Sequence, residues 1–524
     1  MNNNEKVIET DVLIVGYGPV GACLAALLGQ YSTKTMVIDK LDNILDLPRA
    51  IALDNEALRI LQMIDISEHN FEQIGIQEVR MHCPYVGEFG KANTSGTIDG
   101  HPKLITFYQP ELEKALREKV SNSDTVDVAL ETELVNLKQS KDGVTAFLTN
   151  KSGEQYQVQA RYVVGADGAS SYVRNLIGQG LEGETYREDW LVVDANHTNK
   201  KKMNFIEFVC NPKRPTPHMP APGNRERWEF MLHPNEKKEE MEQADKLNEL
   251  LSSWENPQNL NIERQAVYRF HARCCDSFQK DRVFLVGDAA HVTPPFVGQG
   301  LVAGLRDVAN LAWKLSCVID KGANPKLLDS YDQERRPHAK EMIDMAKFMG
   351  KLVMPRSVTK AILIHGLMRL IRLVPPARDY FEELKIKPAN KFKKGLFYKG
   401  KSAFVRGGQL PQELLRTSQG IEWSDDMLGD QLTVLGFGVD PRSKVDYALT
   451  KKWEEMGGTF LHIGTRGHRS ELNTSFAEAL EKKFSDAGKQ EWIVIVRPDR
   501  VVMIDGEASK AKELVSKALR IIQD

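Results

Sequence analysis

The amino-acid sequence predicts an α/β protein, in which a Rossmann-type domain with parallel strands is interrupted by an antiparallel sheet and followed by a smaller α/β unit. Three observations support this prediction. A buried strand runs into a glycine-rich turn and a helix of small residues at 11–40. A strand that ends in an acidic turn returns at 281–315, before another helix. Between them, from about 187 to 273, strand signals alternate with proline-rich turns, which is typical of antiparallel sheets.

The turn Gly16-Tyr17-Gly18-Pro19-Val20-Gly21 predicts a dinucleotide site of the Rossmann type. Gly16 permits the tight turn, Gly18 lets backbone N–H groups approach a pyrophosphate, and Gly21 lets helix and strand pack closely. The helix that follows offers unpaired N–H donors and its positive dipole end to the phosphates. Asp39 ends the next strand, where an acidic side chain accepts hydrogen bonds from ribose hydroxyls. The predicted cofactor site here comprises Gly16, Gly18, Pro19, Gly21, Asp39 and Lys40.

The composition excludes several classes of function. With 524 residues, of which 41% are hydrophobic and 27% charged, the chain has the profile of a multi-domain globular protein. A formal net charge of −2 argues against nucleic-acid binding. The six cysteines lack the spacing of a zinc site, so no metal is expected and the thiols are predicted to be buried in a reduced compartment. Neither a signal peptide nor a membrane-spanning run is recognised, which indicates a cytoplasmic protein.

Further elements are predicted along the chain. Helices are expected near Asn55–Met63 and over Glu111–Val120, and strands over 126–137 and 143–149. The apolar segment 361–374 is broken by a histidine and two arginines, which predicts an amphipathic helix packed on the core rather than a membrane segment. In the C-terminal part, strands are predicted at 432–435, 459–463 and 492–496, and a helix at 508–522.

An interrupted nucleotide-binding domain explains why the strand–turn–helix pattern returns after residue 280. The chain is therefore divided into five segments. They are the first part of the nucleotide-binding domain (1–186), a substrate-binding β-sheet domain (187–275), the completing part of the nucleotide-binding domain (276–345), a helical segment and linker (346–404) and a C-terminal domain (405–524).

Three motifs occur in order within the first 315 residues. They are Gly16-x-Gly18-x-x-Gly21, Asp167-Gly168-Ala169-Ser170-Ser171-x-Val173-Arg174 and Gly287-Asp288-Ala289-Ala290-His291. Their combination resembles the single-component (class A) FAD-dependent aromatic hydroxylases. A closer similarity, to the 3-(3-hydroxyphenyl)propionate hydroxylase group, rests on three further stretches. These are Leu47-Pro48-Arg49-Ala50, Arg227-Trp228-Glu229-Phe230-Met231-Leu232 and Pro294-Pro295-Phe296-Val297-Gly298-Gln299-Gly300-Leu301.

The resemblance implies that the dinucleotide is FAD and extends the predicted cofactor site. In the family, the residue matching Asp288 binds the ribityl chain, and the loop matching 295–302 lies along the flavin. Only a backbone contact is expected of Val302, because many relatives have asparagine there. The added cofactor residues are Arg49, Gln109, Asp167, Arg174, Gly287, Asp288, Pro295, Gly298, Gly300, Leu301 and Val302.

The resemblance also implies the reaction. NADH or NADPH reduces FAD, O2 is captured as a flavin C4a-hydroperoxide, and a phenolic aromatic acid is hydroxylated. The expected partners are thus a small phenolic molecule and O2, with no nucleic acid or membrane, and a homodimer is left open. The C-terminal domain is similar to the thioredoxin-like domain of such hydroxylases. No cysteine follows Cys317, so a structural role is expected for it.

Candidate catalytic residues are His271, Arg227 and Tyr268, in the strand-rich region around the expected substrate. A histidine could assist deprotonation of the phenol, and an arginine facing the ligand could contact flavin or substrate. Core packing and ion pairing explain these residues as well.

Candidate substrate-binding residues are Arg214, His218 and Tyr108. An arginine fork matches the two oxygens of a carboxylate, and a tyrosine can bind a phenol hydroxyl. Proline-flanked surface turns and aromatic packing are the competing interpretations.

Three rival functions are weighed against this one. A flavin halogenase would carry a W-x-W-x-I-P stretch, which this sequence lacks. A hydroxylase of a larger polycyclic or quinoline-type ring stays open, because sequence does not reveal pocket volume. A non-catalytic FAD-binding partner protein is disfavoured by the intact flavin-facing loop.

Overall fold

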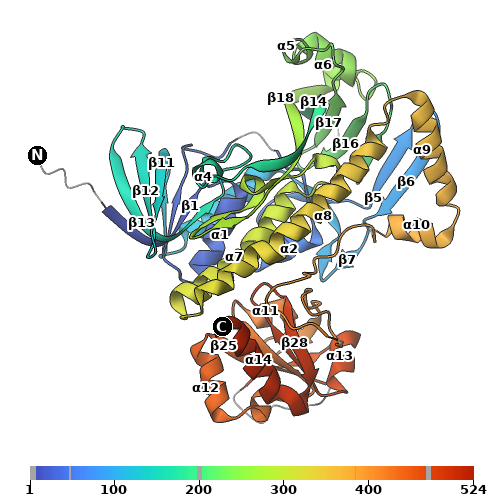
Figure 1. Ribbon diagram of the computed structural model, residues 1–524. Coiled ribbons are helices and arrows are strands. Elements are labelled where there is room, and N and C mark those ends of the chain that lie inside the picture. The colour runs from blue at the N-terminus through green and yellow to red at the C-terminus, as the bar shows by residue number, and fades with distance from the viewer. Residues whose placement is uncertain are drawn as a thin grey trace, which may run out of the picture.

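The computed structural model describes residues 7–45, 49–197, 203–383, 385–400, 402–465, 467 and 474–523. Within them, two eight-stranded sheets and one seven-stranded sheet organise the chain (Figure 1). The first two sheets share the part of the chain before residue 300, and the third belongs to the C-terminal part. Six cysteines are free and buried, as the sequence predicts.

The first sheet grows from the N-terminal strand, whose apolar residues are buried. Its central strand pairs in parallel with its two neighbours, which brings the carboxyl ends of all three to one edge. The strands, in spatial order, are β10 (Val126–Ala129), β2 (Thr35–Ile38), β1 (Val7–Val15), β13 (Gln155–Gly165), β12 (Val144–Asn150) and β11 (Thr132–Gln139), with β20 (Val283–Leu285) joined to β13 and β19 (Gln279–Lys280) joined to β20.

One strand prediction in this sheet is wrong. The segment 126–137 is not continuous, because Glu131 adopts a φ of +52° between β10 and β11. The two pieces pair with different neighbours, β10 with β2 and β11 with β12.

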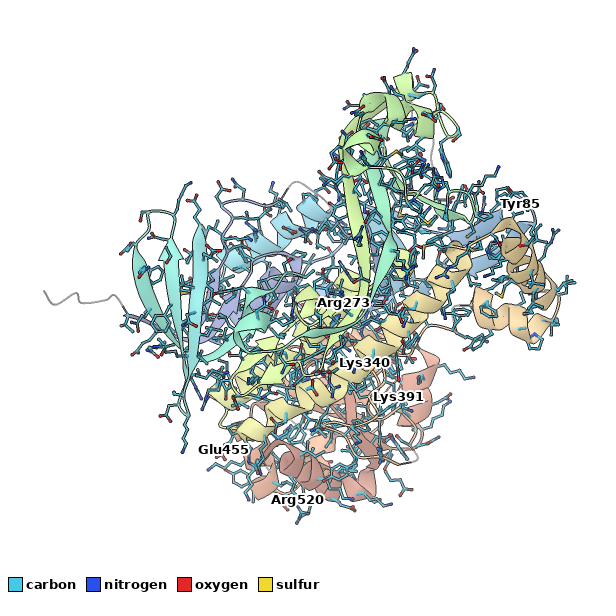
Figure 2. All side chains as sticks on the ribbon, turned by 45° about the horizontal axis from the view of Figure 1, so that its top comes forward. Tyr85, Arg273, Lys340, Lys391, Glu455 and Arg520 are labelled. Atoms are coloured by element: carbon cyan, nitrogen blue, oxygen red, sulfur yellow. The ribbon has the colours of Figure 1, made fainter. Side chains whose placement is uncertain are left out.

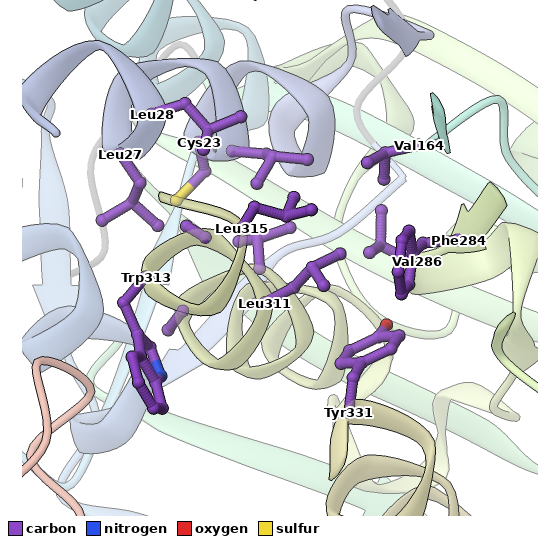
Figure 3. Packing of buried hydrophobic residues seen from close by; sticks show 14 of the residues in the cluster. Cys23, Leu27, Leu28, Val164, Phe284, Val286, Leu311, Trp313, Leu315 and Tyr331 are labelled. Atoms are coloured by element: carbon purple, nitrogen blue, oxygen red, sulfur yellow. The ribbon is translucent and has the colours of Figure 1, made fainter. Parts of the chain in front are cut away.

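Three helices pack on the first sheet and form the largest core cluster: α1 (Pro19–Gln30), α3 (Gln109–Ser121) and α7 (Gly300–Asp320). Figure 3 shows Cys23, Leu27 and Leu28 of α1 facing Leu311 and Leu315 of α7. The close contact of α1 with the sheet explains one glycine of the turn. A Cβ at Gly21 would lie 2.0 Å from the carbonyl oxygen of Gly16.

The second sheet is mostly antiparallel and stands beside the first. In spatial order its strands are β21 (His291–Val292), β18 (Leu260–Cys275), β14 (Leu181–His197), β17 (Arg225–Met231), β16 (Thr216–Ala221), β15 (Phe205–Val209), β5 (Glu78–Cys83) and β6 (Gly87–Asn93). The strands β5 and β6 fall inside the segment 1–186, and β14 starts before 187, so this sheet is not confined to the predicted substrate domain. The strands β5 and β6 join the sheet because β5 pairs in parallel with β15.

Shorter elements connect and cover the sheets. The strands are β3 (Ala52–Asp54), β4 (Gln73–Gly75), β9 (Leu104–Phe107), β7 (Thr97–Ile98) and β8 (His101–Pro102). The helices are α2 (Asn55–Gln62), α4 (Tyr172–Leu176), α5 (Lys238–Met241), α6 (Ala244–Leu251), α8 (Ser330–Val353), α9 (Val358–Ile371) and α10 (Pro375–Glu382). Among the described residues the 3₁₀ turns are Pro257–Asn259, Gly287–Ala289, Pro295–Val297, Pro325–Asp329, Pro441–Lys444 and Ala508–Lys510.

The helix α9 confirms the predicted amphipathic helix, and one face of it packs on a hydrophobic cluster through Ala361, Ile364 and Met368. It covers β6 through a narrow face on which Ala361 and His365 are buried. Leu363 and Leu370 are 72% and 63% exposed, because no other element of the described chain covers the outer side of the helix. Figure 2 places Tyr85, in the turn between β5 and β6, at the same end of the molecule.

The third sheet forms the C-terminal unit, drawn red in Figure 1. Its strands, in spatial order, are β23 (Ile421–Trp423), β22 (Leu414–Arg416), β26 (Ser475–Ala479), β25 (Gly458–Gly464), β24 (Leu432–Phe437), β27 (Trp492–Val496) and β28 (Val502–Glu507). Its helices are α11 (Ser424–Leu428), α12 (Tyr447–Glu455), α13 (Lys482–Gly488) and α14 (Ala511–Gln523).

Buried ion pairs hold this unit against the rest of the chain. Arg497 Nη1 lies 2.7 Å from Glu334 Oε1 of α8, and Arg59 of α2 forms a bidentate pair with Asp425, at 2.7 and 2.8 Å. The Glu334 carboxylate also accepts a hydrogen bond from Lys314.

Candidate active site

A cavity of about 1000 Å³ is lined by residues of both N-terminal sheets. One end lies at the carboxyl edge of the first sheet, where the glycine-rich turn leads into α1. The other end lies on the face of β5, β6, β15, β16 and β17, covered by α8 and α9.

Glycines leave the backbone open at the first end. Gly16 has a φ of +107°, and a Cβ there would lie 2.5 Å from the carbonyl oxygen of Ala166. A Cβ at Gly18 would meet no atom within 4 Å, because the residue faces the cavity. Gly18 is also the N-cap of α1, so the N–H groups of the first turn and the positive end of the helix dipole lie at the cavity.

Two side chains shape the backbone around this end. The Asp39 carboxylate accepts hydrogen bonds from the N–H groups of Tyr17 (2.7 Å) and Leu41 (2.9 Å). Gln109 Oε1 accepts from the N–H groups of Arg49 (2.9 Å) and Ala50 (2.8 Å). Leu47 and Pro48 of the same stretch lie outside the described residues.

Asp288 lines the cavity just after β20. Burial raises the pKa of its carboxyl, although His291 and Arg49 act in the opposite direction. No hydrogen bond joins this carboxyl to another side chain or backbone group in the described part of the chain. It is therefore an unused acceptor that faces the cavity.

The loop 295–300 is held from behind by a buried charged network. Gln299 donates a hydrogen bond to Asp54 (3.0 Å) and accepts one from Arg306 (3.0 Å). Arg306 and Lys387 both pair with Asp54. Burial alone would raise the pKa of Asp54, but Lys387 and Arg306 outweigh it and hold this pKa far below its usual value. The loop then turns at Gly298, with a φ of +62°, into the N-terminus of α7.

The second end of the cavity is apolar. Its lining includes Val79, Met81, Phe89, Ile206, Phe208, Met219, Phe296, Met349, Leu352 and Met368. Two charged residues of β17, Arg227 and Glu229, interrupt this surface. Arg227 is bound in place, because it makes a bidentate pair with Asp194 (2.6 and 3.0 Å) and donates to the carbonyl oxygen of Arg49 (3.0 Å).

Comparison with known proteins agrees with this geometry. The family model described as "FAD binding domain" matches residues 9–346, and the "HcaD C-terminal domain" model matches residues 407–520. A 3-(3-hydroxy-phenyl)propionate/3-hydroxycinnamic acid hydroxylase of Burkholderia vietnamiensis is 34% identical over 95% of this chain and 94% of its own length. A hydroxylase of the same name from Escherichia coli O139:H28 is 32% identical over 94% of this chain and 91% of its own.

The chain belongs to the FAD-dependent aromatic hydroxylases. Solved structures share the fold of this flavin-dependent hydroxylase at low sequence identity. The flavin-dependent monooxygenase PieE, in complex with FAD and substrate, has a TM-score of 0.81 at 20% identity and covers 98% of this chain and 99% of its own. Aklavinone-11 hydroxylase, with FAD and aklavinone, has a TM-score of 0.78 at 20% identity over the whole of both chains.

The residues at the first end fit FAD. Because Gly18 has no side chain, a diphosphate has room to approach the backbone there. The N-termini of α1 and α7 also face the cavity, so their backbone N–H groups can bind the cofactor. The free carboxyl of Asp288 suits a chain of hydroxyl groups. Most of the predicted cofactor residues line the cavity in this structure: Gly16, Gly18, Pro19, Asp39, Lys40, Arg49, Gln109, Asp167, Asp288, Pro295, Gly298, Gly300 and Leu301.

Four predicted cofactor residues do not line the cavity. Gly21 packs α1 against the turn, and Val302 is fully buried in the core. The N–H of Gly287 donates to Asp307 (3.0 Å). The Arg174 guanidinium donates to the carbonyl oxygens of Ala289 (3.0 Å) and Ala169 (2.8 Å), so it joins two motifs instead of reaching the cofactor space.

Two predicted catalytic residues also lie away from the cavity lining. His271 of β18 is hydrogen-bonded to Thr185 of β14 (3.0 Å), and the Tyr268 hydroxyl accepts a hydrogen bond from Arg264. Arg227 does line the cavity, but its guanidinium is paired with Asp194.

The predicted substrate-binding residues do not line the cavity either. Arg214 forms a bidentate pair with Glu236 and donates to the carbonyl oxygen of Met231, which leaves no fork for a substrate carboxylate. His218 stacks on Trp228, with ring centroids 4.9 Å apart, on the opposite face of the sheet. The ring of Tyr108 lies 4.2 Å below the Arg225 guanidinium.

Sequence reasoning missed the apolar chamber and left Glu229 out of the predicted site. The chamber residues come from strands and helices far apart in the chain, and no local pattern joins them. The sequence did contain a signal for Glu229. Alternate residues of a strand point to the same face, so Glu229 is expected on the same face as Arg227, which is predicted to face the ligand.

The ranges that the structure describes contain no helix long and apolar enough to cross a bilayer. Nor do they contain a group of three or more histidine, cysteine, aspartate or glutamate side chains placed to hold a metal ion.

Proposed function

We propose that this flavin-dependent hydroxylase adds a hydroxyl group to a phenol that carries a short carboxylate side chain, of the 3-(3-hydroxyphenyl)propionate type. The observation that carries the proposal is the division of one cavity into a glycine-lined end and an apolar end. Relatives whose names state this activity are 32–34% identical over more than nine-tenths of the chain. The same cavity must hold the dinucleotide, so only part of its volume is left for the substrate, which favours a single ring.

The chain's own residues would bind, orient and shield the reacting groups. FAD, when bound, supplies transfer of electrons from a nicotinamide to O2 and of one oxygen atom to the ring. The turn at Gly16 and Gly18 would hold the diphosphate, and Asp39 and Asp288 would accept hydrogen bonds from hydroxyl groups. Gly300 and Leu301 at the N-terminus of α7 would place N–H donors beside the flavin ring, where negative charge is stabilised. The apolar chamber would exclude water from the ring.

NADH or NADPH is proposed as the electron donor. The sequence contains a second G-x-G-x-x-G, at 178–183, but it runs into the strand β14 and not into a helix. The match at 16–21, which does precede a helix, lies at the glycine-lined end of the cavity, so the nicotinamide would bind transiently.

For the C-terminal unit we propose a thioredoxin-like fold with a structural role. Its strands β24 and β25 are parallel and joined by α12, whereas β27 and β28 form an antiparallel hairpin followed by α14. This order supports the comparison with thioredoxin. The absence of cysteine after Cys317 in the sequence excludes dithiol chemistry there.

The test is a panel of phenols assayed with FAD-loaded protein under air. NADH or NADPH oxidation and hydroxylated product are measured for each compound. Stoichiometric product from 3-hydroxyphenyl alkanoic acids supports the proposal. If product forms only from polycyclic or quinoline-type rings, the proposed substrate class is wrong. If the protein binds FAD but no phenol stimulates NADH or NADPH oxidation, it is a non-catalytic flavin protein.

A further inference from the structure

Alternate residues of β17 face opposite sides of the second sheet. Trp228 and Phe230 pack against α6 and its neighbours, whereas Arg227 and Glu229 line the cavity. The sheet thus directs one carboxylic acid into the substrate end of the cavity.

The immediate cross-strand neighbours of Glu229 are apolar. Val192 of β14 is its direct cross-strand partner, and Pro217 of β16, which also lines the cavity, lies on the other side. Phe208 of β15 continues the same row. The Glu229 side chain is only 8% exposed, yet it accepts no hydrogen bond from any residue that the structure describes. A buried carboxyl without a partner is costly, so its retention in this wall points to a ligand that supplies one.

The charged groups that face Glu229 come from three strands. They are Arg227 on β17, Asp194 on β14 and Arg264 on β18, and Asp194 pairs with both arginines. Two guanidinium groups and one carboxylate leave a charge of +1 on this cluster. An ionised Glu229 would balance that charge, and a protonated Glu229 would leave it free to stabilise an anion in the cavity.

We propose that Glu229 is the general base that removes the proton from the phenolic hydroxyl of the substrate, an inference that rests on the proposed function. In this step the O–H bond of the phenol breaks, and its electron pair stays on the phenolate oxygen. The proton forms a new O–H bond to a carboxylate oxygen of Glu229. The net charge of the site is unchanged, since the phenolate replaces the carboxylate as the counter-charge of the arginine cluster.

The chemistry of the surroundings supports this assignment. Burial raises the pKa of the Glu229 carboxyl, and Arg227 only partly opposes the effect. A raised pKa brings the carboxylate closer to the phenol, whose hydroxyl ionises near pH 10 in water, and makes it a stronger base. Deprotonation makes the ring electron-rich beside the hydroxyl, where the oxygen atom is added.

The test compares FAD-loaded wild type with Glu229→Gln, using 3-(3-hydroxyphenyl)propionate as the probe between pH 6 and 9. The ultraviolet phenolate band of the bound ligand and the rate of ring hydroxylation are measured. The amide keeps the size and polarity of the side chain but cannot accept the proton. The variant should bind the neutral ligand within about fivefold of wild type, lack the phenolate band, and hydroxylate at least about 100-fold more slowly at pH 7. Its rate should rise with pH, as the free phenol ionises.

Matched variants separate a base from a merely structural residue. Glu226→Gln changes a carboxyl on the opposite face of the same strand and should keep the wild-type pH profile. Glu229→Asp retains a carboxyl and should recover part of the phenolate band, which keeps the test decisive if the glutamine variant loads FAD poorly. An analogue with electron-withdrawing ring substituents, already ionised at the assay pH, should restore the rate of Glu229→Gln.

Two failures are distinguishable. If wild type hydroxylates the probe and Glu229→Gln stays within threefold of it across the pH range, the assignment of Glu229 is overturned and the proposed function stands. If wild type itself neither binds nor hydroxylates any phenol, the proposed function fails first.

Discussion

The interface with the C-terminal unit and the wall of the cavity both bury carboxyl groups beside arginines, but two acids of the cavity wall, Glu229 and Asp288, lack the pairing that the acids of the interface have. At the interface, Glu334 accepts hydrogen bonds from Arg497, Lys314 and Asn310, and every atom of its carboxylate has a partner. In the cavity, Glu229 and Asp288 have no hydrogen-bond partner among the described residues. Burial of an acid is therefore common to both regions, and the missing partner is what distinguishes these two acids of the cavity.

The two settings shift the pKa of a buried acid in opposite directions. Burial alone would raise the pKa of Glu334, but Arg497 and Lys314 outweigh it and hold that pKa far below its usual value. At Glu229 burial dominates and the pKa is raised. A buried acid that is paired with a cation stays ionised and stabilises the fold. A buried acid without a partner can still exchange a proton or accept a hydrogen bond.

Removal of the partner at the interface should have the largest effect. Arg497→Met leaves the Glu334 charge buried and incompletely paired, so it should lower the free energy of unfolding by about 3–5 kcal/mol. Denaturant unfolding of the FAD-loaded protein measures this loss. Wild type should also lose stability as the pH falls below about 4.3, where Glu334 of the unfolded chain gains a proton first, and the variant should lose less over that range.

The double variant Glu334→Gln/Arg497→Met is the matched control. It removes both charges and should be more stable than Arg497→Met alone. A single variant as stable as wild type would show that the pairing does not hold the two units together.

Removal of the unpaired acid at the cofactor end should affect binding rather than folding. Asp288→Ala deletes an acceptor that we expect FAD to use, and a hydrogen bond to a charged group contributes about 1.5–3 kcal/mol. The dissociation constant for FAD, measured by fluorescence titration of the apoprotein, should rise roughly 10- to 100-fold. Asp276→Ala, which changes an exposed carboxyl before the same strand, should leave it unchanged. Unaltered FAD affinity in Asp288→Ala would remove this residue from the cofactor site.

The smallest effect is expected from the unpaired acid of the substrate end, and its sign is opposite to that of Arg497→Met. Because the folded-state pKa of Glu229 is raised, its contribution to stability is present below about pH 4.3 and is lost as the pH rises through the folded pKa. Glu229→Gln should therefore match wild type near pH 4 and exceed it at pH 7, by an amount of the order of 1 kcal/mol. Thermal unfolding at the two pH values measures the difference, and a less stable variant at pH 7 would show that Glu229 is paired in solution.

Much of the fold follows from local patterns. The strand–turn–helix unit at the N-terminus, the helix after Pro110 and the strands β24, β25 and β27 lie where apolar periodicity and turn residues predict them. The second sheet was only partly predictable, because β5 and β6 join it by pairing β5 with a strand more than 100 residues later. The break at Glu131 and the exposed face of α9 depend on which neighbours the chain meets in space.

The sequence by itself determined the glycine-lined end of the cavity, where we propose that FAD binds. The glycine turn, the acid at Asp39 and the loop before α7 are contiguous stretches in which backbone conformation and a helix terminus create the site, so residue type and spacing suffice. The tertiary structure alone decided the apolar end, where we propose that the substrate binds. Whether an arginine or an acid is paired depends on side chains that distant strands bring beside it, as Asp194 does for Arg227 and no residue of the described chain does for Glu229.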